Sequence, residues 1–439
     1  MSKPERTLIA CHECGLVSAI PPLGNGHKAS CPRCGHTLAR RVENCSAKVT
    51  AFGISCLVML ALSCSFPFMS FSAGGISHQI SLIDALQVFR HFDNNALAAL
   101  LLSTVIFLPA LYIVVVMYLF ALTEKKVEGK ATLTPDHVAK RLCRLVFRVE
   151  IWLLVDIFLI GVIVSLVKIA ALADVELGSA FWSYAAYSAL VVLFSRAIDK
   201  EWLWENLLPH CSTGDVKTGD THLSSNHTAC SLCHQINPHS KGKLPTYCCR
   251  CDSKLHHYEP RTNDSWAWSF LFSAIIFYIP ANLYPMMYTV SLGSTERSTI
   301  MDGVILLWQL GSYPVASIIF IASVFVPMTK MFIMIWLLRS SKATTYESDS
   351  NAMKKLKYYR FTELVGRWSM IDVFVVALLS ALVNLKGLMT ISPGPAALYF
   401  ALVVFFTMCA ALIFDPRTFW GPYVPNKQNE TSALTVQAA

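Results

Sequence analysis

Charged side chains are scarce in this 439-residue chain. Asp, Glu, Lys and Arg together make up 15% of it, whereas soluble proteins carry roughly a quarter. Hydrophobic residues reach 54%, and the mean hydropathy is +0.49. This composition excludes a disordered or fibrous chain and argues against a soluble enzyme. The sequence therefore predicts a polytopic membrane protein.

Motifs that would identify a familiar enzyme are also missing. The sequence has no Walker-A loop, no GxSxG nucleophile elbow and no HExxH motif. We therefore expect no enzymatic activity and no ATP hydrolysis by this chain. The opening MSKPERTLIACHECG contains no apolar core of a signal peptide, so we expect the N-terminus to stay in the cytoplasm.

Long apolar stretches alternate with polar segments along the chain. A helix that crosses a bilayer needs about 20 residues, and eight stretches are predicted as spans. Basic residues concentrate in the segments 123–148 and 339–367. The positive-inside rule places these segments and both termini in the cytoplasm. The predicted spans are 51–71, 96–122, 151–173, 177–195, 266–292, 312–338, 368–388 and 395–414.

Matching residues recur at a nearly constant distance. Pro67 and Pro285 are 218 positions apart, and Asp156 and Asp372 are 216 apart. This regularity predicts a tandem duplication of a four-helix transmembrane unit. Because each copy has an even number of spans, the copies should be parallel rather than inverted.

The spacing of the cysteines points to metal binding rather than to disulfides. Four CxxC pairs form two groups, one before each predicted copy. Each CxxC presents two thiolates from a tight turn, and two turns complete a tetrahedral site that suits zinc. Four thiolates leave no open coordination position, so we expect structural zinc, two ions per chain. The predicted ligands are Cys11, Cys14, Cys31 and Cys34 in the first group, and Cys230, Cys233, Cys248 and Cys251 in the second.

Other interpretations of the CxxC pairs are a redox function and a rubredoxin-like iron site. A thioredoxin-like motif would need a βαβ context, which these short polar segments lack. The segments carry no stripe of basic and aromatic residues, so we expect no nucleic-acid binding. The seven remaining cysteines, Cys249 among them, are interpreted as small buried residues or incidental thiols.

The sequence thus predicts an all-α polytopic membrane protein, with a small β-type zinc ribbon before each four-helix unit. Two short segments, 80–89 and 300–310, are amphipathic and expected in the membrane interface. The predicted domains are a first zinc ribbon at 8–44, a first four-helix unit at 48–205, a second zinc ribbon at 226–260, a second four-helix unit at 264–420 and a disordered tail at 421–439.

Charged residues inside predicted spans mark a candidate site. An ionised side chain at mid-bilayer costs about 2.5–3.5 kcal/mol on insertion scales unless it is paired or reaches water. Lys330 in the sixth span and Asp372 in the seventh both fall in the cytoplasmic half, where they could meet. Ser323 and Ser369 share helix faces with them, and Thr407 in the eighth span could approach the same depth. A structural ion pair and a proton-titratable relay both fit this pattern.

The first copy lacks part of this pattern. Asp156 matches Asp372, but Tyr112 stands where the second copy has Lys330. The polar site is therefore expected in full only in the second copy. Pro109 and Pro327 lie inside spans and should distort them, either as packing geometry or as a hinge.

Several longer phrases carry a resemblance to a known family. Residues 366–374 read GRWSMIDVF, residues 311–316 read GSYPVA, and residues 414–417 read FDPR. Together with the two CxxC groups and the FPF and YPM phrases, they make the chain resemble the paraquat-inducible protein A (PqiA) family over about residues 8–420. This family consists of inner-membrane proteins of Gram-negative bacteria.

The resemblance implies a function as an integral inner-membrane component of an intermembrane phospholipid transport system. The implied partner is a periplasmic MCE-domain protein, a homo-hexamer that forms a hydrophobic tunnel, and the implied context is envelope stress. Proton movement through the polar site could drive transport. Two alternatives remain, a passive scaffold that anchors the tunnel and a cytosolic zinc or redox stress sensor. The resemblance also implies a polar network of Ser323, Lys330, Ser369, Asp372 and Thr407.

Overall fold

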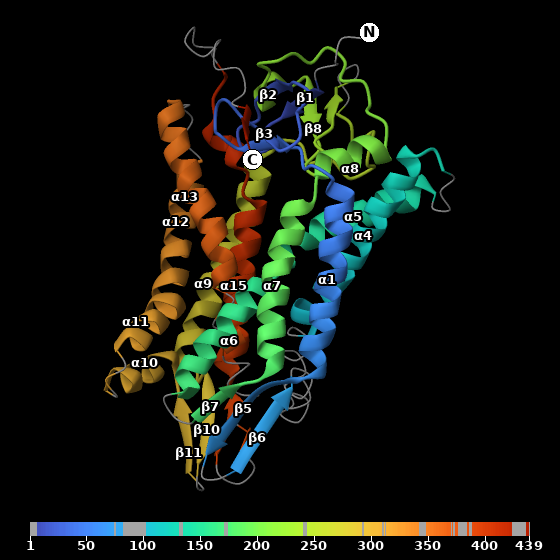
Figure 1. Cartoon of the computed structure of the whole chain (residues 1–439). Helices are drawn as coiled ribbons and strands as arrows, with labels where there is room; N and C mark the ends of the chain where they lie inside the picture. The colour runs from blue at the N-terminus through green and yellow to red at the C-terminus, as the bar shows by residue number, and fades with distance from the viewer. Residues whose placement is uncertain are drawn as a thin grey trace.

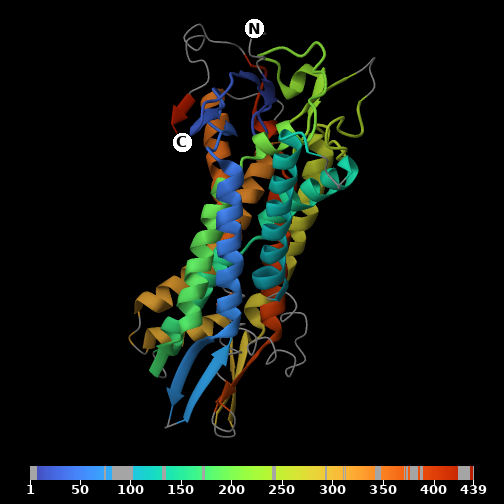
Figure 2. The same cartoon turned by 45° about the vertical axis from the view of Figure 1, so that its right-hand side comes forward.

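Long helices run side by side through the computed structural model of the protein, with small β-modules at one end and β-sheets at the other (Figure 1). We call these the cysteine end, where the cysteine-rich segments lie, and the sheet end. The view turned by 45° shows the same division (Figure 2). The structure describes residues 7–73, 76–81, 102–130, 135–170, 174–239, 244–291, 294–309, 311, 313–341, 348–369, 371, 374–375, 384–385, 389–423 and 436–438.

Two small β-modules lie at the cysteine end, the first cysteine module (residues 7–40) and the second cysteine module (residues 227–255). Their strands are β1 (Thr7–Ala10), β2 (Val17–Ile20), β3 (His27–Ser30), β4 (Thr37–Arg40), β8 (His227–Ala229) and β9 (Ile236–Pro238). β1 pairs with β2, β3 with β4 and β8 with β9, always antiparallel. The predicted β-type modules are therefore present at both cysteine-rich segments.

The turns that carry the CxxC pairs each end in a residue of left-handed backbone. Gly15 and Gly35 follow the pairs of the first cysteine module, with φ of 72° and 71°. In the second cysteine module His234 and Asp252 take these places, with φ of 55° and 58°. Glycine adopts this conformation without steric strain, and His and Asp do so more readily than most residues. All four turns thus follow a similar backbone path.

The C-terminal tail differs from the prediction of a disordered segment at 421–439. Residues 424–435 lie outside the described residues, but β14 (Val436–Ala438) pairs antiparallel with β3. Without β14, β3 would be an edge strand with unpaired backbone groups, which an extended segment can satisfy. Composition could not predict this contact, because backbone hydrogen bonds place little demand on the side chains of the added strand.

The first helical half (residues 45–207) is built around long apolar helices. Its elements are α1 (Cys45–Ser65), η1 (Leu102–Phe107), α4 (Leu108–Val127), α5 (Asp136–Val149), η2 (Glu150–Trp152), α6 (Val155–Ala170), α7 (Ser179–Ala197) and α8 (Lys200–Leu207). A short helix, η3 (His222–Ser224), follows this half. α1 packs along α7 and α4, and α8 follows α7 after a bend of 52°.

The second helical half (residues 260–423) has a similar order of elements. They are α9 (Pro260–Leu283), α10 (Ile300–Gln309), α11 (Tyr313–Phe320), η4 (Ile321–Phe325), α12 (Val326–Ser340), α13 (Asp349–Trp368), α15 (Pro395–Ile413) and η5 (Pro416–Phe419). α9 packs along α15, as α1 packs along α7. The segment 300–310, expected to be short and amphipathic, contains α10, whereas most of segment 80–89 lies outside the described residues.

Five helices in the described part of the chain are long and apolar enough to cross a membrane, and the bent pair α7 and α8 would make a sixth. These correspond to the predicted spans one, two, five, six, eight and four. A shorter apolar helix within α6 corresponds to the third span, and most of the seventh span lies outside the described residues. The chain is therefore a multi-pass membrane protein. The five helices are Cys45–Ser65, Leu102–Val127, Asn263–Leu283, Ile321–Ser340 and Pro395–Ile413.

The predicted ends of the first and fifth spans, 51–71 and 266–292, were wrong. α1 ends at Ser65 and α9 ends at Leu283, and strands begin soon afterwards. The residue before a proline is disfavoured in the helical region. Phe66 and Tyr284, which precede prolines, have extended backbones with ψ of 161° and 156°. Apolar length alone therefore overestimated both helices.

Two β-sheets cover the sheet end, which the all-α prediction did not include. Their strands are β5 (Pro67–Ala73), β6 (Ile76–Ser81), β7 (Asp174–Leu177), β10 (Met287–Ser291), β11 (Ser294–Ser298), β12 (Asn384–Leu385) and β13 (Met389–Pro393). The strand orders are β6-β5-β7 and β11-β10-β13-β12. Each sheet joins the strand after the first long helix of a half to the strand before its last long helix. The structure is mostly helical, as predicted, with these sheets in addition.

Pro109 and Pro327 each lie directly after a π-helical turn. η1 ends two residues before Pro109, and η4 ends two residues before Pro327. Proline lacks the N–H for an i to i−4 hydrogen bond, and its ring crowds the preceding turn. A wider π-helical turn relieves that crowding. The predicted distortion is therefore a local rewinding of the helix in both halves.

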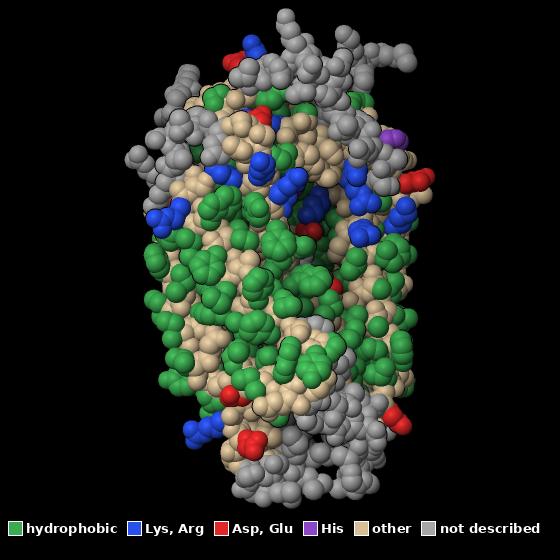
Figure 3. All heavy atoms as spheres, turned by 90° about the vertical axis from the view of Figure 1, so that its left-hand side faces the viewer, with side chains coloured by type: hydrophobic (Ala, Val, Ile, Leu, Met, Phe, Trp, Pro, Cys, Tyr) green, Lys and Arg blue, Asp and Glu red, His purple; other side chains and the backbone are tan. Residues whose placement is uncertain are grey.

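Hydrophobic side chains form a broad band over the middle of the face that carries α10 to α13 (Figure 3). Most basic side chains visible on this face lie along the edge of the band nearest the cysteine end (Figure 3). Phe325, Phe332, Phe361 and Leu364 are each at least half exposed. A soluble protein rarely exposes apolar surface of this extent, so the band fits a surface in contact with lipid.

Gly178 and Gly394 lie where the chain passes from a sheet into the last long helix of each half. A Cβ atom on Gly178 would lie 2.1 Å from the carbonyl oxygen of Pro67, and one on Gly394 would lie 2.1 Å from that of Pro285. Both glycines also donate backbone hydrogen bonds at the start of the facing strand, Gly178 to the carbonyl oxygen of Phe68 at 3.1 Å and Gly394 to that of Met286 at 2.8 Å. The backbone therefore cannot move away without breaking the sheet.

We expect Gly178→Ala and Gly394→Ala each to destabilise the protein by about 1–3 kcal/mol through this overlap. The apparent melting temperature of the purified protein in detergent measures the effect. Gly303→Ala is the matched control, because a Cβ atom there meets nothing within 4 Å. A Gly394→Ala protein as stable as Gly303→Ala would contradict the close approach.

Candidate functional site

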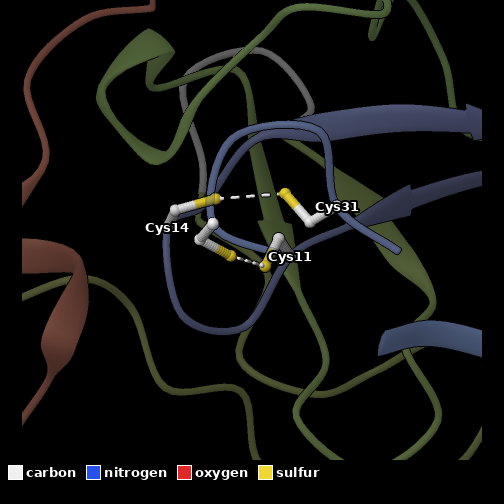
Figure 4. A group of neighbouring side chains, drawn as sticks. Cys11, Cys14 and Cys31 are labelled. Carbon is white, nitrogen blue, oxygen red and sulfur yellow. Dashed lines mark hydrogen bonds between the residues drawn. The ribbon is translucent and has the colours of Figure 1, made fainter. Parts of the chain in front are cut away.

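The four cysteines of the first group come together as the sequence predicts. Their Sγ atoms all lie within 4.8 Å of one another and are buried. Cys11 and Cys34 are 3.4 Å apart, and Cys14 and Cys31 are 3.5 Å apart, measured between sulfur atoms. Figure 4 shows the labelled cysteines turned toward one another between the two CxxC turns. A tetrahedral ion with ligands at about 2.3 Å holds sulfur atoms roughly 3.8 Å apart, so this cluster could hold a metal ion.

The second group of cysteines has the same arrangement. Cys230 and Cys251 are 3.5 Å apart, and Cys233 and Cys248 are 3.6 Å apart, again between sulfur atoms. All four side chains are buried, and their Sγ atoms lie within 4.8 Å of one another. The structure therefore places all eight predicted ligands in two clusters, each with four donors and the geometry of a closed metal site.

Glu13, between the ligands Cys11 and Cys14, is 8% exposed and ties the first cluster to its surroundings. Its carboxylate accepts a 3.0 Å hydrogen bond from Nε of Arg360 and lies 3.3 Å from Nδ1 of His36. Burial raises the pKa of Glu13, but the hydrogen bonds from His36 and Arg360 outweigh it and hold the pKa at about 2. The same contact raises the pKa of His36. Glu13 therefore stays charged at neutral pH.

One cysteine interpretation was wrong. Cys249, expected to be an incidental thiol, forms a disulfide with Cys211 in this structure. The bond joins the second cysteine module to the segment that follows α8. The two cysteines are separated by 38 residues, and no local pattern marks them as partners. Only the fold brings them together.

The first cysteine module docks on the second helical half. The Arg33 side chain is 2% exposed and donates to Oδ1 of Asp349 at 2.7 Å. It also donates to the carbonyl oxygen of Gly421 at 3.0 Å and stacks over the Trp420 ring at 4.7 Å. The buried cysteines of this module share a hydrophobic core with α12, α13 and the end of α15.

The second cysteine module docks on the first helical half. Arg250 donates to the carbonyl oxygen of Leu208 at 3.4 Å, and Arg144 of α5 donates to that of Asp252 at 2.8 Å. The buried cysteines of this module share a core with α4, α5 and α8. Through these contacts each module meets the half that does not follow it in the chain. The sequence did not predict that each module would dock on the other half.

Lys330 of α12 is a deeply buried cation in the second half. It is 2% exposed, and its Nζ donates a 2.9 Å hydrogen bond to Oγ1 of Thr407 on α15. The Thr407 hydroxyl in turn donates to the carbonyl oxygen of Val404 at 2.9 Å. The described acceptor of the lysine is thus a neutral hydroxyl. Lys330 and Thr407, two of the five predicted network residues, are thus hydrogen-bonded to each other.

For the other predicted network residues the structure shows no hydrogen bond to Lys330 among the described residues. Ser323 in η4 is 3% exposed, and Ser369 at the end of α13 is 4% exposed. The Ser369 hydroxyl contacts the carbonyl oxygen of Val365 at 3.4 Å. Asp372 lies outside the described residues, so its predicted pairing with Lys330 stays a prediction.

Gly366 of α13 provides space for the lysine. A Cβ atom at this position would lie 3.0 Å from Nζ of Lys330 and 3.4 Å from its Cε. The sequence motif GRWSMIDVF contains this glycine, but its function was not predicted. Any residue larger than glycine at this position would compete with the Lys330 side chain for the same space. Gly366 is therefore part of the site.

A cleft lies between α12 and α13 beside the buried lysine. It encloses about 310 Å³, counting its open mouth. Its rim includes Phe325 and Phe361, which are 58% and 50% exposed. The cleft therefore connects the surroundings of Lys330 with the apolar surface. Its lining residues are Phe325, Val326, Thr329, Lys330, Ile333, Phe361, Thr362 and Val365.

The first half has no lysine at the corresponding place. Tyr112 of α4 is 2% exposed and packs edge-on against Phe194, with ring centroids 6.1 Å apart. Asp156 lies near the start of α6 and is partly buried. The two halves therefore differ in the chemistry of this position.

A family model described as Paraquat-inducible protein A matches residues 47–207 and 265–423. These segments correspond to the two helical halves, and both cysteine modules lie outside them. No solved structure matches the chain.

Named relatives align over nearly the whole chain. Intermembrane transport protein PqiA of Escherichia coli (strain K12) is 37% identical over 425 residues, covering 97% of this chain and 98% of the relative. A probable intermembrane transport protein of Haemophilus influenzae (strain Rd) is 26% identical over 428 residues, covering 96% and 98%. Lipophilic envelope-spanning tunnel protein A of E. coli (strain K12) is 24% identical over 411 residues, covering 93% and 90%. The chain therefore belongs to the paraquat-inducible protein A family.

Proposed function

We propose that the protein is an inner-membrane component of an intermembrane lipid transport system. It passes phospholipid to or from a periplasmic MCE-domain tunnel protein, expected to be a homo-hexamer. The relatives named as an intermembrane transport protein and as an envelope-spanning tunnel protein support a transport function. The multi-pass apolar bundle supports a location in the membrane.

The two helical halves represent a tandem duplication in this proposal. The same family model matches each half separately, which supports it. The matched close approaches at Gly178 and Gly394 support it further. The same applies to the π-helical turns before Pro109 and Pro327. A duplicated scaffold with one altered copy can assign transport to one half and support to the other.

The cysteine end and both termini face the cytoplasm in this proposal. Basic residues in the last turns of α4 and α12, namely Lys125, Lys126 and Arg339, support this orientation. So does the gathering of basic side chains along the edge of the apolar band nearest the cysteine end (Figure 3). The sheet end then faces the periplasm, where the tunnel partner would bind.

The buried Lys330 is the observation on which the transport mechanism depends. An amino group in the apolar interior is costly unless a partner compensates it, and the described partner, Thr407, is neutral. We place Asp372 as the anionic partner and Ser323 and Ser369 as further members of the network. Proton exchange within this network would change the charge between α12 and α15. That change can favour different positions of these helices as lipid passes.

A passive scaffold and a redox sensor are the alternatives to active transport. The disulfide between Cys211 and Cys249 is the observation that favours a redox sensor. It lies at the cysteine end, however, and leaves the buried lysine unexplained. Transport accounts for that lysine, so we prefer it.

We expect Lys330→Met and Asp372→Asn each to abolish lipid transfer, because removing one partner of a buried pair strands the other charge at a cost of about 3–5 kcal/mol. The double variant should regain stability, since neutral residues of similar volume replace both charges, but it should stay inactive. Transfer from proteoliposomes to acceptor vesicles in the presence of the tunnel partner measures this. Asp156→Asn is the control from the first half and should be tolerated. Transfer at the wild-type rate by the double variant would instead show a structural pair.

The two cysteine clusters hold structural zinc in this proposal, one ion each. Small modules of this kind fold with their metal, so we expect elemental analysis of the purified protein to find two zinc ions per chain. Cys11→Ser and Cys230→Ser should each remove one ion and lower the yield of folded protein, while Cys64→Ser, outside both clusters, should change neither. Iron in place of zinc, or a well-folded protein without metal, would overturn the assignment.

A further inference from the structure

Arg144 and Arg360 are 216 positions apart, the offset that relates the two halves, and they make similar contacts. Arg144 of α5 donates to the carbonyl oxygen of Asp252, which directly follows the ligand Cys251. Arg360 of α13 donates to the carbonyl oxygen of Cys34 at 3.1 Å. Each arginine therefore reaches the turn of the last cysteine in the cluster of the module docked on its half.

Arg360 also forms an ion pair with Glu13. Its Nε donates to Oε1 of Glu13 at 3.0 Å, and its Nη2 donates to Oε2 of the same carboxylate. Glu13 belongs to the first CxxC turn of the cluster and Cys34 to the second. One guanidinium thus joins both CxxC turns to α13 through a bidentate, charge-assisted pair. The contact described for Arg144 is with a carbonyl oxygen alone.

The same stretch of α13 forms one wall of the lysine site. Gly366 follows Arg360 by six residues, about 9 Å along a helix, and a Cβ atom there would lie 3.0 Å from Nζ of Lys330. Thr362 and Val365, between them, line the cleft. Small shifts of α13 along or about its axis would therefore change the space left for Lys330.

α13 is also fixed against the helix that carries the acceptor of the lysine. The Tyr359 hydroxyl, next to Arg360 in sequence, donates a 3.1 Å hydrogen bond to the carbonyl oxygen of Ala411 on α15. Thr407, one turn before Ala411, accepts the hydrogen bond of Lys330. One turn of α13 thus contacts both the first cysteine module and α15.

We propose that Arg360 is a positioning residue through which the first cysteine module sets the geometry of the Lys330 site. The module contacts the start of α13 through Arg33 and Asp349 and its middle through Glu13, Cys34 and Arg360. Of these two contacts, the one at Arg360 is nearer to Gly366, which lies against the lysine. The second cysteine module does not act in this way, because the position 216 before Gly366 is Glu150 and Tyr112 replaces the lysine. The inference rests on the proposed transport function, since the site it positions is the transport site.

Arg360→Gln in the full-length protein tests this, with Arg144→Gln as the matched control. We expect Arg360→Gln to keep two metal ions per chain, to speed backbone hydrogen exchange in α13 about tenfold and to lower lipid transfer about tenfold. Arg144→Gln should speed exchange in α5 and leave transfer unchanged. Arg360→Lys, which keeps the charge but loses the bidentate geometry, should recover part of both effects. Unchanged exchange in α13, or equal loss of transfer in both Gln variants, would overturn the proposal.

Glu13→Gln provides a second route if Arg360→Gln loses metal from the first cluster. It weakens the same ion pair from the side of the module and keeps the shape of the side chain. When Glu13→Gln and Arg360→Gln are combined, their effects on hydrogen exchange and on lipid transfer should not add, because both substitutions break the same ion pair. Additive effects would overturn the coupling. A wild-type protein that transfers no lipid with its partner would contradict the proposed function, while the exchange measurements would still decide the coupling.

Discussion

An amino group buried in an apolar helical bundle needs a partner, and this constraint organises the second half of the molecule. Lys330 is bonded to Thr407 across α12 and α15, and Gly366 leaves room for it on α13. Residues from the three helices α12, α13 and α15 thus surround this one side chain. In the first half the corresponding Tyr112 is uncharged, and burying its phenol costs far less than burying an unpaired ammonium group. The two halves share a scaffold but not this chemistry.

Because each cysteine module docks on the half that does not follow it, segments far apart in the sequence are brought into contact. Arg33 near the N-terminus contacts Gly421, which is 388 positions away, while the second module meets the first half. The modules also touch each other through a small apolar cluster that includes Val17 and Ile236. The helical halves therefore cannot separate at the cysteine end without breaking contacts of the cysteine modules. Folding of the modules and placement of the helices are linked by this arrangement.

Features that depend on neighbouring residues could be predicted from the sequence, and contacts between distant segments could not. The CxxC spacing specifies its turns directly, so both cysteine clusters were found. The apolar stretches predicted most helices, but not the strands that begin at Pro67 and just after Pro285. The ion pair between Glu13 and Arg360 joins positions 347 apart. No local pattern encodes such a contact, because it exists only after the two segments have folded and docked.

The central claim is that lipid transport depends on the buried lysine of the second half and not on its counterpart in the first. The most direct measurement compares lipid transfer by Lys330→Met and Tyr112→Phe in proteoliposomes with the tunnel partner, at equal amounts of folded, metal-loaded protein. Transfer should fall to background with Lys330→Met and stay near the wild-type rate with Tyr112→Phe. Wild-type transfer by Lys330→Met would contradict the claim, and so would an equal loss in both variants.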